Sequence, residues 1–226
     1  MRLKNLVLVV IALFSLYFPV HAGSLGLHKV FTNNMVLQRD IAVPVWGKAN
    51  PGDKISVAFA GQVKDSVADS EGNWSLKLDP LKASKEPQVM TVKSSSQSLE
   101  IKNILVGDVW LCSGQSNMAF QLKGALGAEE EIKNAKNPDI RIFTVKDSRA
   151  KKPSSDLNGS WLECSPDTIR TFSAVAYYFG KELNSKLNMP IGLITSAVGG
   201  SPAEAWTSMK SLESNPALEP IAADFK

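Results

Sequence analysis

Hydrophobic and polar residues alternate with a period of two between residues 42 and 105, a pattern typical of strands with one buried and one solvated face. The clearest apolar series are Ile55, Val57, Phe59; Trp74, Leu76, Leu78; and Leu99, Ile101. Sequences rich in Asn, Asp, Gly and Pro separate the runs at 50–53, 60–62 and 69–73 and predict turns. About five to seven short strands at this spacing predict a small antiparallel β-sandwich.

The pattern changes after Gly107, where short continuous apolar runs replace the alternation. These runs cover 109–112, 140–145 and 191–195, and each has the length of a buried parallel strand. A weak helix is predicted over 128–135, and a stronger one before Pro190. The stronger helix is indicated by apolar residues at three-four spacing, namely Phe172, Val175, Ala176, Phe179, Leu183 and Leu187. Strands that alternate with helices predict a doubly wound α/β sheet.

The predicted fold class is therefore α+β and multidomain: a β-sandwich-like module over 23–105, then an α/β domain over 106–226. Only three strands can be counted in the second part, and an open α/β sheet usually has about five or more. We therefore expect that this α/β domain is incomplete as written. Residues 146–159, rich in Ser, Lys and Asp, predict an exposed loop.

The first 22 residues have the pattern of a secretory signal peptide. A basic start precedes an apolar run over 6–20, and the segment ends in Val20-His21-Ala22 before Gly23. The run is shorter than the about 20 residues of a membrane span, although an uncleaved anchor is the alternative. Cleavage near Ala22–Gly23 predicts a secreted or periplasmic protein with no stable membrane insertion.

Composition excludes several classes of function. Loss of the signal peptide removes Arg2 and Lys4 and no acidic residue, so the formal net charge falls from +3 to +1. A nearly neutral chain with interspersed charges does not indicate nucleic-acid binding. No His or Cys cluster has metal-ligand spacing, so neither a metal nor another cofactor is expected. Cys112 and Cys164 are the two cysteines, and whether they form a disulfide stays open, as does the oligomeric state.

One candidate for chemistry is Ser116, in the stretch GDVWLCSGQSNMAF. It follows a predicted strand, and ligands of open α/β sheets bind at the carboxyl ends of the strands. Gly114 would let the chain bend, while the side chains of Gln115 and Asn117 offer donors to a substrate or an oxyanion. Ser116 is thus a candidate nucleophile; the alternative is that it only caps a helix.

The second candidate is the stretch ITSAVGGSPAEAW, which also follows a predicted strand and should face the same crevice. Gly199 and Gly200 permit a tight turn whose N–H groups are free to act as oxyanion donors. Ser201 is expected to cap a helix, with Pro202 in its first turn and Glu204 completing a capping box.

A serine nucleophile needs a base, and the mature chain retains only one histidine, His28. This residue precedes the β module, and we expect a surface or packing role for it. No S-x-x-K pattern includes Ser116, and Met118 stands where the G-x-S-x-G elbow would have its second glycine. The residues therefore supply a nucleophile and oxyanion donors without a base.

The two stretches, in this order, resemble the bacterial sialate O-acetylesterases, within the SGNH-type carbohydrate esterases. The sequences HKVFTNNMVLQRDIAVPVWGKANPGDKISVAF and WLECSPDTIRTFSAVAYYFGKEL resemble the same family, so the similarity runs from about residue 28 to 206. The resemblance implies that Ser116 is the nucleophile for removing an acetyl ester from a sugar. It also implies that the N–H of Ser116, with that of Gly199 or Gly200, forms part of the oxyanion hole.

Members of that family also carry a later W-x-Q-G-E block and a D-x-x-H block that supplies the base and its orienting Asp. Neither pattern occurs in this sequence. We therefore expect these residues to be the N-terminal part of a longer protein, with little esterase activity alone.

The resemblance leads to a secreted acetylesterase whose partner is an O-acetylated sialic acid. Two alternatives stay open at this point. The same chemistry would serve another glycan, such as acetylated xylan, and a chain that is complete as written would be a non-catalytic carbohydrate-binding protein.

Overall fold

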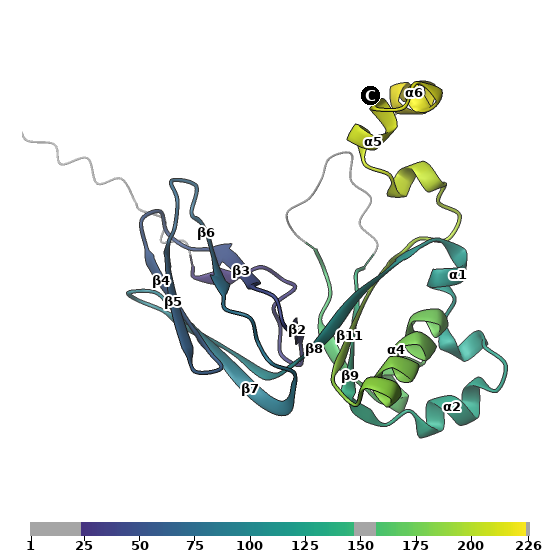
Figure 1. Ribbon diagram of the computed structural model, residues 1–226, viewed down its shortest axis with the longest axis horizontal. Helices are drawn as coiled ribbons and strands as arrows, with labels where there is room; N and C mark the ends of the chain where they lie inside the picture. The colour runs from purple at the N-terminus through teal and green to yellow at the C-terminus, as the bar shows by residue number, and fades with distance from the viewer. Residues whose placement is uncertain (1–23, 147–156, 225–226) are drawn as a thin grey trace, which may run out of the picture.

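The computed structural model describes residues 24–146 and 157–224. The predicted signal peptide and most of the predicted loop over 146–159 lie outside these residues. Strands gather at one end of the molecule and helices at the other, and one long strand, β8, connects the two parts (Figure 1). Within the described ranges, no helix has both the length and the apolar character needed to cross a membrane.

The first part consists of the strands that the alternating pattern predicts, together with two short ones that it does not. The strands are β1 (Gly26–Leu27), β2 (Val36–Gln38), β3 (Val43–Lys48), β4 (Lys54–Phe59), β5 (Gln62–Val67), β6 (Asn73–Leu78), β7 (Ser84–Lys93) and β8 (Ser98–Gly114). Strands β1, β3 and β6 form a three-stranded sheet, whereas β5, β4, β7 and β8 belong to a larger one. The apolar residues of both sheets face a shared core, as the period of two predicts.

The pairing in this part is antiparallel with one exception. Strand β2 runs parallel to β8, with Val36 opposite Leu105. The sequence pattern, which begins at residue 42, predicts neither β2 nor this parallel pair. The structure therefore shows two sheets with a common core and one parallel strand pair, rather than a purely antiparallel arrangement.

Strand β8 runs through the position at which the sequence predicts a domain boundary, between residues 105 and 106. Its first half pairs with β7 and its last seven residues pair with the parallel strand β11 (Ile191–Ala197). The expectation of two separate strands here is wrong. Gly107 lies in the middle of β8, where a Cβ atom would come within 1.9 Å of the carbonyl oxygen of Pro190. Only glycine lets β8 pass so close to the segment at Pro190. The division of the chain into two domains stays a prediction.

The second part is built on β8, β9 (Asn137–Thr144) and β11, in the order β9-β11-β8, all parallel. A fourth strand, β10 (Trp161–Cys164), pairs antiparallel with β9 and was missed, because four residues are too few for a periodic signal. The helices are α1 (Ser116–Ala119), α2 (Ala128–Asn134), α3 (Pro166–Ile169), α4 (Ala174–Leu187), α5 (Met209–Glu213) and α6 (Glu219–Asp224). Three short 3-10 helices are η1 (Leu122–Gly124), η2 (Ala203–Trp206) and η3 (Pro216–Leu218).

Helix α4 packs against β11 through a face that overlaps only in part with the stripe that the sequence predicts, since Ala176 belongs to both. Its buried residues are Ala174, Ala176, Tyr177 and Gly180. Two residues of the predicted stripe, Val175 and Phe179, are 48% and 39% exposed. Apolar residues flank the buried face of α4 on both sides, so the sequence pattern does not define one face. The small residues that allow close packing contribute little to a hydrophobic pattern.

The two parts share side-chain contacts as well as β8. Phe143 and Trp161, from β9 and β10, belong to the core of the first part, and the Trp161 indole N–H donates to the carbonyl of Val30 over 2.9 Å. Arg141 is only 2% exposed and donates to the side chain of Asn103, which lies on β8. Overall the protein is α+β, with an antiparallel region followed by a mostly parallel one.

Candidate active site

Ser116 lies at the carboxyl end of β8, as the sequence predicts, and it is the first residue of α1. The N-cap of this helix is Gln115, whose side-chain oxygen accepts hydrogen bonds from both the N–H and the hydroxyl of Ser116, over 2.9 and 2.8 Å. The alternative that Ser116 is itself the cap is therefore wrong. Gly114 has a φ of +144°, which disfavours any other residue at this bend.

The two stretches singled out in the sequence meet at this point. Strand β11 ends beside β8, with Ala197 opposite Gly114, and the N–H of Val198 donates to the carbonyl of Gly114 over 3.0 Å. The next turn brings the N–H of Gly200 to 3.4 Å from the Ser116 hydroxyl oxygen. Gly200 has a φ of +76°, a conformation that glycine adopts without strain.

Gly199 also borders the Ser116 hydroxyl. A Cβ atom built on Gly199 would lie 3.7 Å from the Ser116 oxygen, which is ordinary contact. Both glycines therefore line the space in front of the hydroxyl. Asn117, the remaining side chain expected here, is exposed on α1 next to Ser116.

The capping box predicted at Ser201 does not form. Helix η2 begins only at Ala203, its N-cap is Pro202, and no side chain caps it. The Ser201 hydroxyl instead donates to the carbonyl of Val198 over 2.7 Å and accepts from the indole N–H of Trp206, also over 2.7 Å. Ser201 therefore closes the turn that contains Gly199 and Gly200, and this tertiary use of its hydroxyl explains the wrong prediction.

A hollow of about 270 Å³ lies at the carboxyl ends of the parallel strands, next to α1. Its lining residues come from four elements and the segments that follow them: Met118, Ala119, Gln121, Thr144, Val145, Lys146, Thr171, Ser173, Thr195 and Ala197. The Ser173 hydroxyl caps α4 and also donates to the sulfur of Met118 over 3.5 Å. The sequence predicts a binding role for none of these residues, although four of them lie in the two stretches already singled out. Thr144 and Thr195 had a usable signal, as polar residues at strand ends.

His28 does not approach Ser116. It lies beside β3 in the first part of the molecule, where its ring packs on Trp46 with centroids 5.1 Å apart. Its Nδ1 accepts a hydrogen bond from the N–H of Val30 over 3.2 Å. The expected packing role of His28 agrees with this position.

Metal chemistry receives no support from side-chain positions. Within residues 24–146 and 157–224, no group of three or more His, Cys, Asp or Glu residues could hold a metal ion. Cys112 and Cys164 are both buried and unbonded. Burial raises the pKa of the Cys164 thiol to about 11, so this cysteine is neutral and unsuited to nucleophilic attack.

The chemical content of the site is thus a serine hydroxyl at a helix start, with a backbone donor aimed at its oxygen and an adjoining polar hollow. Such an arrangement suits acyl transfer, in which a hydroxyl attacks a carbonyl and backbone N–H groups stabilise the oxyanion. The described histidine, His28, is not part of this arrangement.

Comparisons with known proteins find similarity to carbohydrate esterases. The profile of the family described as "Carbohydrate esterase, sialic acid-specific acetylesterase" matches residues 106–217. Sialate O-acetylesterase from Homo sapiens is 36% identical over 200 residues, and the protein of that name from Rattus norvegicus is 34% identical over 200 residues. Each match covers 80% of this chain, but only 38% and 37% of the two relatives, so the chain spans less than two fifths of their length.

Among solved structures, a carbohydrate acetylesterase from Xanthomonas citri superimposes with a TM-score of 0.81 and 36% sequence identity. The superposition covers 83% of this chain and 43% of the Xanthomonas protein. It includes both parts of the fold, since residues 106–226 alone are too few to account for that coverage.

Proposed function

Because residues 106–217 place the chain in the sialic acid-specific acetylesterase family of carbohydrate esterases, we propose that it contributes the nucleophile and oxyanion donors of a serine acetylesterase. The proposed substrate is an O-acetylated sialic acid. The observation that carries the proposal is the 3.4 Å contact between the Gly200 N–H and the Ser116 hydroxyl oxygen. It aims a backbone donor from one of the two stretches at the candidate nucleophile of the other.

In the proposed reaction the Ser116 oxygen attacks the acetyl carbonyl carbon and its proton passes to a base. The oxyanion is stabilised by the N–H groups of Gly200 or Gly199 and of Ser116. The bond to the sugar oxygen then breaks, the sugar leaves with a proton, and the acetyl group stays on Ser116. Attack by water releases acetate and restores the hydroxyl.

This reaction requires a rearrangement of Gln115. In the structure its side-chain oxygen accepts hydrogen bonds from both the N–H and the hydroxyl group of Ser116. The N–H has to be free for the oxyanion, and the hydroxyl proton has to face a base. We therefore propose that the Gln115 side chain rotates away when substrate binds, and that it and Asn117 then contact the sugar.

The wider architecture is part of the same proposal. We infer that residues 23–105 are a sandwich-like module and that residues 106–226 begin an SGNH-type α/β domain. The parallel order β9-β11-β8 supports the α/β part of this reading. The signal-like sequence over 1–22 supports action outside the cytoplasm.

A second candidate keeps the mechanism and changes the sugar. The Xanthomonas structure is described only as a carbohydrate acetylesterase, and its similarity covers more of this chain than the sialate esterases do. Acetylated xylan is therefore the comparison substrate for the test. The non-catalytic alternative predicts no turnover of either substrate.

The test compares the natural full-length protein with its Ser116→Ala variant on O-acetylated sialic acid, acetylated xylan and a small acetyl ester. Ser116→Ala should abolish acetate release from all three. Ser113→Ala is the matched control, because Ser113 is also an exposed serine near the end of β8 and should leave activity intact. Normal hydrolysis by Ser116→Ala would refute the proposal, and the ratio of the two sugar rates decides between the substrates.

A further inference from the structure

We propose a second carbohydrate-binding site, for a neutral sugar ring, on the outer face of the small sheet formed by β1, β3 and β6. Its centre is Trp46 on β3. The choice of a sugar as the ligand rests on the proposed function, whereas the existence of the site rests on the geometry described next. The site lies in the strand-rich part of the molecule, away from α1 and Ser116 (Figure 1).

Trp46 is exposed on a face whose other positions are mostly polar. In β3 the side chains of Val43 and Val45 are buried, whereas Trp46 is 37% exposed and points to the opposite face. Its cross-strand neighbours are Ser75 on β6 and His28, whose N–H donates to the Trp46 carbonyl over 3.1 Å. A half-exposed tryptophan among polar residues is a surface feature that favours ligand contact.

The indole is held in place before any ligand arrives. Phe31 makes an edge contact with it, with ring centroids 4.7 Å apart and planes at 78°. His28 packs on it at 5.1 Å with planes at 36°. A rigid aromatic surface loses little side-chain entropy on binding, which is the property that makes tryptophan effective in binding sites.

Hollows adjoin the indole on both sides. One has a volume of about 380 Å³ and includes His28 and Lys48; the other has about 470 Å³ and includes Trp74 and Ser75. Both are lined by Trp46, Gly47 and Asn73, so they form a continuous groove across the strands. Each is within the range of about 300–1,000 Å³ that is typical of small-molecule sites.

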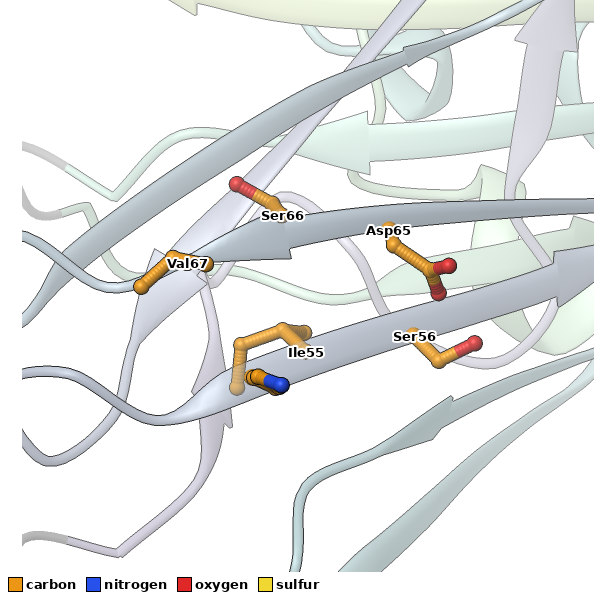
Figure 2. Close-up of a pocket in the computed structure, with 6 residues that line it drawn as sticks. Ile55, Ser56, Asp65, Ser66 and Val67 are labelled. Carbon is orange, nitrogen blue, oxygen red and sulfur yellow. The ribbon is translucent and has the colours of Figure 1, made fainter.

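A third hollow of about 360 Å³ extends the groove toward β4 and β5. It shares Ser66 and Val67 with the second hollow. Figure 2 shows these two residues at one end of it, with Ser56 and Asp65 on the adjacent strands.

The strand that carries Trp46 lies close to its neighbours on the core side. A Cβ atom at Gly47 would come within 1.9 Å of the carbonyl oxygen of Gly26 and 2.9 Å of the Trp74 ring. Trp74 is 2% exposed and belongs to the core behind the sheet. The outer face is therefore contributed by the alternate positions, Trp46 and its cross-strand partner Ser75.

The polar groups around the groove carry both charges, which suits a hydroxyl-rich ligand. Lys29 and Lys48 line the first hollow, whereas Asp69 lines the second and keeps its negative charge. Hydrogen bonds from the side chain and the N–H of Asn73 lower the pKa of Asp69. Donors and acceptors of this mixed kind suit the hydroxyls of a neutral sugar.

The test is isothermal titration of the full chain in a Ser116→Ala background, which removes turnover from the measurement. The probes are lactose and xylotetraose, which are neutral, and free N-acetylneuraminic acid, which is anionic. We expect saturable binding of a neutral probe. Trp46→Ala should weaken it at least about tenfold, and Trp46→Phe should keep part of it.

Two further variants make the outcome unambiguous. Ser75→Arg places a long side chain over the indole from an exposed position, so it should block binding with an unchanged melting temperature. Trp110→Ala removes another half-exposed tryptophan, on β8, and should leave binding unchanged. Absence of binding by any neutral probe, or binding that survives both Trp46→Ala and Ser75→Arg, would overturn the proposal. Failure of the esterase proposal alone would leave these titrations unaffected.

Discussion

The N–H of Gly200 lies 3.4 Å from the hydroxyl oxygen of Ser116, although 84 residues separate the two in the sequence. The contact depends on the adjacent parallel strands β8 and β11, which end together at Gly114 and Ala197. It also depends on the positive φ of Gly200, which turns the N–H toward Ser116. Backbone geometry, rather than any side chain, therefore defines the donor side of the candidate active site.

Gly200→Val should lower the kcat of the full-length protein about 100- to 1,000-fold with a smaller change in KM, because one oxyanion donor is worth about 2.7–4 kcal/mol. Valine disfavours a φ of +76°, so the N–H would turn away from Ser116. Gly52→Val is the matched control: Gly52 has a φ of +80°, and like Gly200 it has open space where a Cβ would lie. Steady-state kinetics with a small acetyl ester measures both; equal losses would show that only stability changed.

Gly180→Val should destabilise the fold by about 1–3 kcal/mol, because it overpacks the contact between α4 and β11. A Cβ atom at Gly180 would come within 2.5 Å of a methyl carbon of Leu193, a buried residue. Glu182→Val is the control, since it places the same β-branched residue at an exposed position of α4. Valine is a better helix former than glycine and a poorer one than glutamate, so helix propensity alone would favour the Gly180 variant. Urea denaturation of both variants measures the difference; equal stabilities would contradict the close packing.

Glu131→Gln should lower the melting temperature at pH 7 and have little effect near pH 3. Burial raises the pKa of Glu131, but hydrogen bonds from Lys181 and Tyr177, both 2.5 Å long, outweigh it and lower the pKa below its ordinary value of 4.5. A carboxyl whose pKa is lowered by folding stabilises the protein above pH 4.5 and loses that contribution as the pH falls through its folded value. Thermal melts at both pH values check this.

The control for this pH dependence is Glu130→Gln, which neutralises the exposed neighbour of Glu131 on α2. It should shift the melting temperature by the same small amount at both pH values. A pH-independent loss for Glu131→Gln would mean that shape, rather than charge, accounts for its contribution.

Both cysteines should react slowly with a thiol reagent at pH 8 in the native protein and rapidly after unfolding without reductant. Cys164 is 2% exposed and Cys112 is 7% exposed, and burial raises the pKa of each thiol. The unfolded chain should titrate as two thiols, and Cys164→Ser should reduce this to one. No reactive thiol after unfolding would reveal a disulfide and contradict the structure.

Sequence patterns located the site more accurately than they described its surroundings. Ser116 and Gly200 could be found because each directly follows an apolar strand, and such positions converge in an α/β sheet. The role of Gln115 as the cap could not be found, because serine is the commoner capping residue. The hollow beside Ser116 was missed because four separate elements line it, and no one of them has a distinctive pattern.

The strands over 54–59 and 73–78, the helix over 128–134 and the two site stretches were determined by the sequence itself, because the period of burial is a local property. Only the tertiary structure decided that β8 is one strand through both parts, that α4 packs through Tyr177 and Gly180, and that Ser201 bonds to Trp206. These features depend on which distant segment packs against each element. A hydrophobic pattern predicts that one face of an element is buried. Which other element packs against that face depends on how well the shapes of the two surfaces fit together.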